Sequence, residues 1–382
     1  MKWEIKQIEE ICTIVTSGGT PKSTTSSFYY PKEVPWLKTG EVNYCRIYDT
    51  ETYISKEGLA RSSAKLIPEN SVIVAMYGNT AGRVAINKIQ ICTNQACCNL
   101  VINHDIADYQ YVYYVLSNMY DKLVSLKNGA AQLNLNARAL KAFEISFPDI
   151  ETQKKIGQTL SAYDDLIENN QKQIKLLEEA AQRLYKEWFV DFRFPGYEDT
   201  KFIDGIPEGW RKYRIDDIFK IKYGKTLSTS KINKIGKYPV YGANGVIGYY
   251  NEKNCNDYVV LITSRGNGSG DVSRTHDKES FVTNNSFLVN PFNVNYRLSY
   301  VHQLIKTINF KNICTGSAQP QLTNNSISML SAIVASDELV GRFCDVGDLL
   351  YEKIDNILKQ NILLTQARDR LLPKLMSGEI EV

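Results

Sequence analysis

GAAQLNL at residues 129–135 and GSAQPQL at residues 316–322 are two versions of one phrase, placed 187 positions apart in a chain of 382 residues. A true repeat keeps its register beyond the phrase that reveals it. At the same offset Lys172-Gln173 aligns with Lys359-Gln360, and Arg183-Leu184 aligns with Arg370-Leu371. No gap is needed over the whole stretch, so the chain contains two repeated halves.

The repeat continues upstream with a looser register. The matching pairs are VAMYGNTAGRV (74–84) with ITSRGNGSGDV (262–272), TNQ (93–95) with TNN (283–285), and Trp3 followed by IEEI (8–11) with Trp210 followed by IDDI (215–218). Their offsets are 188, 190 and 207, so the ends of each half are kept while the middles diverge. This pattern is typical of a common scaffold that holds two variable modules.

The ends that stay in register have the pattern of long helices. Apolar side chains from Ile156 to Trp188, and from Phe343 to Leu375, recur at alternating steps of four and three residues, the heptad of a coiled-coil seam. Each of the two helices is expected to be about 40 residues long, well beyond the usual helix of ~10–14. We therefore predict that the two helices pair with each other, antiparallel; the alternative is that each packs only on its own domain.

Five positions on these helices interrupt the seam or the helix. Asn170 and Asn361 are polar seam residues of the kind that fixes register, and Gly347 and Arg368 weaken the second seam. Pro373 is predicted to end or kink the second helix.

The middles of the two halves have the pattern of strands and turns. Short β-branched and aromatic runs, such as SVIVAMYG (71–78) and YVVLITS (258–264), are broken by Gly, Pro and Asn. One helix is expected in each middle, over 108–126 and 295–308. The predicted fold is α/β (α+β): two mixed domains (1–150 and 210–336), two long helices forming an antiparallel coiled coil (151–192, and 337–382 with the tail), and a connector (193–209), related by an internal pseudo-two-fold repeat.

Composition is that of an ordinary globular protein, with 43% hydrophobic and 23% charged residues. The N-terminal MKWEIKQIEE lacks the apolar stretch of a signal peptide, and no apolar run reaches the ~18 residues of a membrane span. We expect a cytoplasmic protein without a membrane partner. The eight cysteines form no CxxC pair, which favours free thiols over a metal site.

The sequence matches none of four catalytic or cofactor-binding motifs. Gly224-Lys225-Thr226 ends like a phosphate-binding loop, but Phe219 occupies the position that requires Gly. GNGSG (266–270) continues with Asp271 and fails the dinucleotide pattern, and no [DN]PP[YF] stretch of amino-methyltransferases occurs. Pro148-Asp149 lacks the Glu-x-Lys that a nuclease would need. We therefore expect a non-catalytic chain.

Charge is distributed unevenly along the chain, although the net value is only +3. Residues 210–336 carry 16 Lys/Arg against 7 Asp/Glu, whereas both neighbouring segments are acidic. Such a segment indicates an anionic partner, although a solvated lysine-rich surface would have the same composition.

Glycine-rich loops in both middles carry the amide, hydroxyl and guanidinium groups that bind DNA bases and phosphates. The candidate DNA-binding residues are Lys22, Lys38, Asn79 and Arg83 in the first domain, and Lys225, Asn244, Arg265, Asn267 and Arg274 in the second. Gln132 and Gln319, in the doubled phrase, are candidates for DNA-backbone contacts or for capping the turn.

The sequence resembles the specificity subunits of type I restriction–modification systems. The resemblance rests on GGTPK (18–22) after Trp3, the doubled phrase, IPEGW (206–210) and the tail LLPKLMSGEIEV (371–382), and it covers the whole chain. It implies two target-recognition domains that each read half of a bipartite site in double-stranded DNA, with the paired helices setting the spacer.

The resemblance also implies partners: two modification subunits that dock on the helices and use S-adenosylmethionine, and two restriction subunits that use ATP and Mg²⁺. No cofactor is expected on this chain. Two other classes stay open from the residues alone: a coiled-coil scaffold whose α/β domains bind protein, and a stand-alone nuclease or methyltransferase.

Overall fold

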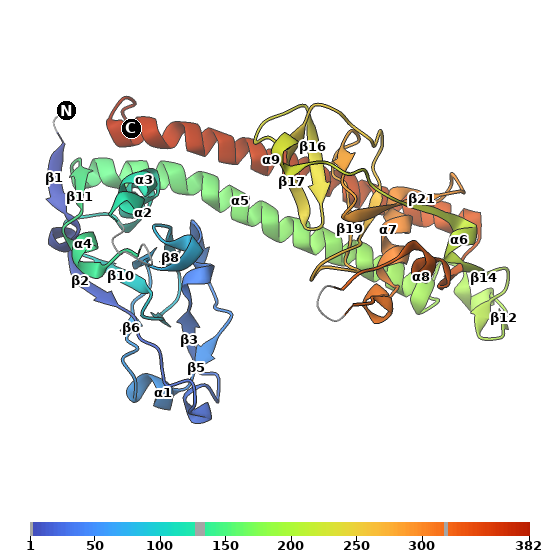
Figure 1. Cartoon of the computed structure of the whole chain (residues 1–382), viewed down its shortest axis with the longest axis horizontal. Coiled ribbons are helices and arrows are strands. Elements are labelled where there is room, and N and C mark those ends of the chain that lie inside the picture. Colours follow the sequence, from blue (N-terminus) through green and yellow to red (C-terminus); the bar gives the residue numbers. More distant parts are fainter. Residues whose placement is uncertain (1–2, 127–133, 317–319) are drawn as a thin grey trace. The chain divides into compact units, whose positions relative to one another are not determined.

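The computed structural model describes residues 3–126, 134–316 and 320–382 and divides into two compact units (Figure 1). Unit 1 comprises Met1–Glu168 with Asn361–Val382, and unit 2 comprises Asn169–Gln360. Each unit holds one sheet-rich domain together with one stretch of each of the two long helices, α5 (Ile150–Tyr185) and α9 (Asp337–Ser377). The mixed α/β class predicted from the sequence is confirmed.

The domain of unit 1 is built on a five-stranded sheet in the order β2-β10-β7-β8-β4. These strands are β2 (Cys12–Ser17), β10 (Cys97–Ile102), β7 (Val72–Ala75), β8 (Val84–Asn87) and β4 (Cys45–Ile47). A second sheet has the order β5-β3-β9-β6, with β5 (Tyr53–Ile54), β3 (Val34–Leu37), β9 (Ile91–Thr93) and β6 (Leu66–Ile67). The remaining pair is β1 (Glu4–Gln7) with β11 (Glu144–Phe147).

Helix α2 (Tyr109–Asn118) packs on the five-stranded sheet, and its side chains from Tyr111 to Leu116 are all buried. Tyr111, Val112 and Leu116 are fully buried in one core with Val72 and Leu100. The shorter helices of unit 1 are α1 (Lys56–Ala60), α3 (Tyr120–Ser125) and α4 (Ala137–Lys141), with 3₁₀ turns at Ile8–Ile11, Ser26–Phe28, Thr39–Glu41 and Gly78–Thr80.

The domain of unit 2 repeats this plan with a sheet in the order β15-β21-β18-β19. These strands are β15 (Phe219–Tyr223), β21 (Ser286–Pro291), β18 (Val260–Thr263) and β19 (Val272–Arg274). Beside it lie the sheet β17-β16-β20, formed by Gly245–Tyr250, Tyr238–Gly242 and Phe281–Val282, and the pairs β14 (Arg211–Arg214) with β22 (Ser331–Val334) and β12 (Phe202–Ile203) with β13 (Ile206–Pro207). The helices are α6 (Ile215–Ile218), α7 (Leu298–Lys306) and α8 (Asn324–Ser328), with 3₁₀ turns at Tyr197–Asp199, Thr229–Lys231 and Phe310–Ile313.

The offset of 187 found in the sequence also relates the structures of the two halves. Helices α4 and α8, strands β11 and β22, and the starts of α5 and α9 are each 187 positions apart. The caps follow the same rule: Asn136 accepts from the Ala139 N–H at the start of α4, and Thr323 accepts from the Ser326 N–H at the start of α8. The internal repeat is therefore structural.

The doubled phrase closes each domain just before these elements. Its last leucines, Leu135 and Leu322, are buried, and their N–H groups donate to the Met76 and Ser264 carbonyls at 3.0 and 2.9 Å. Gln132 and Gln319 lie outside the described residues.

The long helices pair antiparallel. Within unit 2, the centres of the Tyr185 and Phe343 rings are 5.7 Å apart, and Ala181 packs with Tyr351 and Ile354. Residue numbers along the contact therefore fall on α5 as they rise on α9, which is the pattern of an antiparallel pair. In unit 1, Arg368 of α9 pairs with Asp164 of α5. After Tyr185, α5 continues as a π-helical turn to Val190. The prediction of mutual pairing is confirmed.

The structure bears on two expectations about the second helix. Of the two outcomes predicted for Pro373, an end to the helix does not occur: α9 continues to Ser377, because Leu375 and Met376 are buried in the core of unit 1 and hold the last turn in place. Gly347 is not simply a weak seam position: a Cβ there would lie 2.8 Å from Ser299 Oγ, so the glycine lets α7 approach the helix. Among the described residues, no helix is both long and apolar enough to cross a membrane.

Candidate nucleic-acid interface

In unit 2, four of the five candidate residues gather at one end of the main sheet. Arg265 and Asn267 are exposed in the loop that follows β18, and Asn244 is exposed in the turn between β16 and β17. A Cβ at Gly268 would lie 3.4 Å from Asn244 Oδ1, so this turn touches the Arg265 loop. Lys225 follows β15, and its carbonyl accepts the Asn284 N–H at 3.1 Å.

The second copy of the doubled phrase joins the same cluster. Arg265 forms a β-bridge with Gln321, and Ser264 receives the Leu322 N–H. The loop after β18 is thus held between two backbone segments, which leaves its exposed polar side chains on a supported loop. Such an arrangement presents hydrogen-bond donors to a ligand at low conformational cost.

In unit 1, the candidates Lys38, Asn79 and Arg83 come from two adjoining loops. Thr80 Oγ1 donates to the Thr39 carbonyl at 2.7 Å, and Arg83 Nη1 donates to Asn43 Oδ1 at 2.7 Å. Lys38 and Asn79 are exposed, and the Lys38 ammonium lies 5.4 Å from the centre of the Trp36 ring. Lys22 is also exposed, in the loop after β2, where its carbonyl accepts the Thr25 N–H.

Arg274 has a different role from the one predicted. Its side chain is only 4% exposed, and its Nη2 and Nη1 donate to the two carboxylate oxygens of Asp355 on α9 at 2.8 and 3.0 Å. The guanidinium also lies 4.5 Å from the centre of the Tyr351 ring. The structure therefore places Arg274 in a buried contact between the domain and α9, and not on the exposed loops that carry the other four candidates.

Sequence reasoning missed Gln95 and Asn285, which are exposed in the turns of the matched triplets TNQ and TNN. Met76 N–H donates to the Ala96 carbonyl, and Ser264 N–H donates to the Asn285 carbonyl, both at 2.8 Å. These bonds place each triplet beside the glycine-rich loop of its own domain. The repeat itself was the signal that could have found them.

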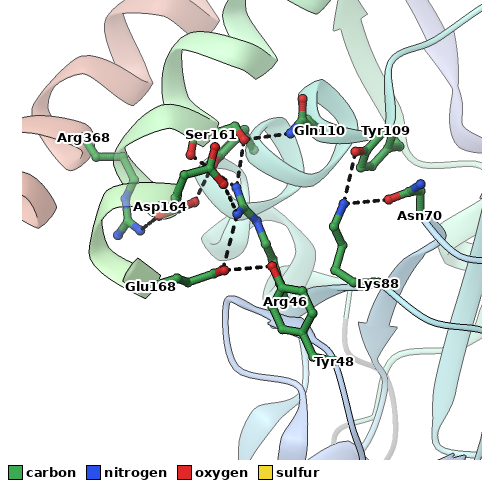
Figure 2. A network of polar contacts seen from close by, with 12 residues as sticks. Arg46, Tyr48, Asn70, Lys88, Tyr109, Gln110, Ser161, Asp164, Glu168 and Arg368 are labelled. Atoms are coloured by element: carbon green, nitrogen blue, oxygen red, sulfur yellow. Dashed lines mark hydrogen bonds and ion pairs between the residues drawn. The ribbon is translucent and has the colours of Figure 1, made fainter. Parts of the chain in front are cut away.

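A second missed feature is the network that fastens the unit 1 domain to α5 (Figure 2). Arg46 of β4, 8% exposed, pairs with Asp165 and with Glu168 (3.4 Å), and its Nη2 donates to Ser161 Oγ at 2.8 Å. Burial alone would lower the pKa of Arg46, but the hydrogen bond to Asp165 and the charge of Glu168 outweigh it and raise that pKa. The guanidinium therefore stays charged.

The same network reaches the second helix and the domain helix α2. Asp164 accepts from Arg368 of α9 and from the Tyr114 hydroxyl of α2, and the Tyr48 hydroxyl donates to Glu168 Oε2 at 2.8 Å. Burial, followed by the charge of Asp164, raises the pKa of Tyr114, so its hydroxyl remains a donor. Arg368, which weakened the predicted apolar seam, is therefore a polar tie between the two helices.

Comparison with known proteins identifies the family. The family described as "Type I restriction modification DNA specificity domain" matches residues 1–179 and 207–333. The chain belongs to this family. As a type I specificity subunit it is the DNA-recognition component of a restriction–modification complex, a non-catalytic part of that complex.

One relative of this specificity subunit matches it over its whole length, and another matches about half of it. It is 28% identical over 409 residues to the MjaIX type I restriction enzyme specificity subunit of Methanocaldococcus jannaschii, covering 100% of this chain and 94% of the relative. It is 26% identical over 185 residues to the EcoR124I/EcoR124II specificity subunit of Escherichia coli, covering 47% and 45%. The fold matches that of the type I restriction–modification S subunit from M. genitalium, with a TM-score of 0.63 at 20% identity, over 98% of this chain and 96% of that one.

Proposed function

We propose that each sheet domain of this specificity subunit reads one half of a bipartite site in double-stranded DNA, and that the α5–α9 pair sets the spacer between the halves. The observation that carries this proposal is the matched placement of loops. The exposed loops after β7 and after β18 leave equivalent strands, because the order β2-β10-β7-β8 in unit 1 corresponds to β15-β21-β18-β19 in unit 2, and the side chains on the two loops differ. Two equivalent platforms with different side chains suit two different half-sites.

For base readout we propose Lys22, Lys38, Asn79 and Arg83 in unit 1, and Lys225, Asn244, Arg265 and Asn267 in unit 2. Arginine and lysine donate to guanine O6 and N7, and asparagine pairs with adenine N6 and N7. Gln132 and Gln319 are proposed as backbone contacts or turn caps. The excess of basic residues over 210–336 supports phosphate attraction by the second domain.

The helices are proposed to dock two modification subunits, which bind S-adenosylmethionine, while two restriction subunits use ATP and Mg²⁺. Leu176 and Leu363 support two equivalent docking points: they are 187 positions apart, and each is 64% exposed on its helix. A single exposed leucine is ordinary on a protein surface, so the support comes from its repetition at the offset that relates the two helices. The assembly would work in the cytoplasm, and this chain would bind no cofactor itself.

Footprinting of the full chain with its modification subunits tests the proposal. We expect two protected segments separated by an uncontacted spacer of fixed length, and affinity that falls steeply with salt as phosphate contacts are lost. One contiguous protected segment would contradict bipartite reading. Binding to other proteins with no salt-dependent affinity for DNA would favour a protein scaffold instead.

A further inference from the structure

Each sheet domain is fastened to a long helix by an arginine and by a ring side chain two residues later. In unit 1 these are Arg46 and Tyr48, which both reach Glu168 of α5 (Figure 2). In unit 2 they are Arg274 and His276, which both reach Asp355 of α9; His276 Nδ1 lies 2.8 Å from Asp355 Oδ1. Tyr48 directly follows β4 (Cys45–Ile47), and His276 lies two residues beyond the end of β19 (Val272–Arg274). In each domain the arginine and the ring side chain thus meet one carboxylate where an edge strand ends.

The two carboxylates follow the repeat, whereas the two arginines do not. Glu168 and Asp355 are 187 positions apart, the offset that relates the helices. Arg46 and Arg274 are 228 positions apart and stand on strands that do not correspond, because β19 matches β8 rather than β4. Both strands are, however, the outer edge of their main sheet. Two domains with different edge strands thus contact the same repeated helix position with the same chemistry.

Such a contact fixes the position of the domain on the helix more than it raises the free energy of unfolding. A buried ion pair stabilises a protein little more than well-packed apolar side chains of similar volume, because both charges lose their hydration. It does demand one geometry: a bidentate guanidinium that slides off its carboxylate leaves two buried charges unpaired. Arg274 and Asp355 are 4% and 8% exposed, so both charges of the unit 2 pair would lose their partner away from water. In unit 1 this penalty falls on Arg46, which is 8% exposed, because Glu168 is 24% exposed.

We propose that Arg46–Glu168 and Arg274–Asp355 are positioning latches that fix where each recognition domain sits along its helix, and thereby restrict the DNA spacer length that the protein accepts. The inference rests on the proposed bipartite reading. One added base pair moves a half-site by about 3.4 Å along the duplex and rotates it by about 35°. A domain free to shift by one helical turn, about 5.4 Å, would tolerate one or two such steps.

Selection from a pool of randomised DNA duplexes tests the latch in unit 2. The full chain and its Asp355→Asn variant, each in complex with the modification subunits, are used to enrich duplexes. Affinities are then measured with the enriched half-sites separated by spacers shortened or lengthened by one and two base pairs. For the unaltered chain we expect affinity to fall about tenfold for one base pair, a cost comparable to one mismatched pair in a site. For Asp355→Asn we expect a fall below about threefold with the same half-site sequences.

Two further variants keep the outcome decisive. Asp216→Asn breaks the exposed pair with Arg214 in the same unit and should keep the tenfold dependence. If Asp355→Asn fails to fold, the apolar double variant Arg274→Met with Asp355→Leu replaces it; this variant should fold and also lose the spacing dependence.

The possible results separate the two proposals. If the unaltered chain enriches no two-part site, both the bipartite function and the latch are overturned. If it enriches a two-part site and the latch variants still demand a single spacer length, the latch alone is overturned. Relaxed spacing together with altered half-site sequences would also overturn the latch, because Asp355 would then act on base reading itself.

Discussion

Replacement of Asp355 by asparagine is expected to destabilise unit 2 by about 3–5 kcal/mol, the usual cost of removing one partner from a buried ion pair. The structure supports the size of this effect. Asp355 is 8% exposed and Arg274 is 4% exposed, so the guanidinium would keep its charge in a site with almost no water. Two charge-assisted hydrogen bonds are weakened, each worth about 1.5–3 kcal/mol. Asparagine retains one acceptor oxygen, which places the expected loss near 3 kcal/mol.

Amide hydrogen exchange followed by mass spectrometry is the suitable assay, because a chain of two units need not unfold in one step. A loss of about 3 kcal/mol corresponds to exchange that is roughly 150-fold faster in strands β18 and β19. Strands β7 and β8 of unit 1 serve as the internal control and should keep their rates. An acceleration below about tenfold in β18 and β19 would refute the reasoning, since the pair would then behave as a solvated one.

Three other predictions concern separate parts of the chain. Gly18→Ala should lower the thermal unfolding midpoint sharply, because its Cβ would overlap the Thr93 carbonyl, whereas Gly40→Ala, with open space around it, should leave the midpoint unchanged. Burial lowers the pKa of His302 to about 3, so between about pH 6.5 and 3 only the unfolded chain binds this proton. The free energy of unfolding should therefore fall by about 1.4 kcal/mol for each unit by which the pH is lowered within this range. In His302→Gln, urea midpoints at pH 7 and pH 5 should differ less than in the unaltered chain. Arg265→Ala should cost about 1–3 kcal/mol of affinity and relax one base position in a binding-site selection; an equal loss on every sequence would make it a phosphate contact.

Much of the fold could be predicted because it depends on periodic or repeated features. The heptad spacing from Ile156 onward and the constant offset of 187 together predict two long helices and their antiparallel pairing. The fate of Pro373 could not be read from local rules, since the burial of Leu375 and Met376 in the unit 1 core outweighs the hydrogen bond that proline removes.

The candidate site was predicted at the level of loops and less well at the level of residues. Arg265 and Asn267 are exposed where the glycine-rich pattern placed them. Arg274 lies in the same basic segment, but its partner Asp355 is 81 positions away on another element. Arg46, which no motif marks, has partners 115 to 122 positions away. Pairing over such distances leaves no local signal that separates a DNA-reading arginine from a structural one.

The pairing of β1 with β11, and of β14 with β22, has a consequence for how new DNA specificities arise. Glu4 faces Phe147, and Arg211 faces Val334, so the chain enters and leaves each domain on neighbouring strands about 4.8 Å apart. A genetic exchange with its endpoints in these two strands replaces an entire reader while the helices keep their sequence. The carboxylate that an arginine at the edge of the incoming sheet would engage is already present on the helix.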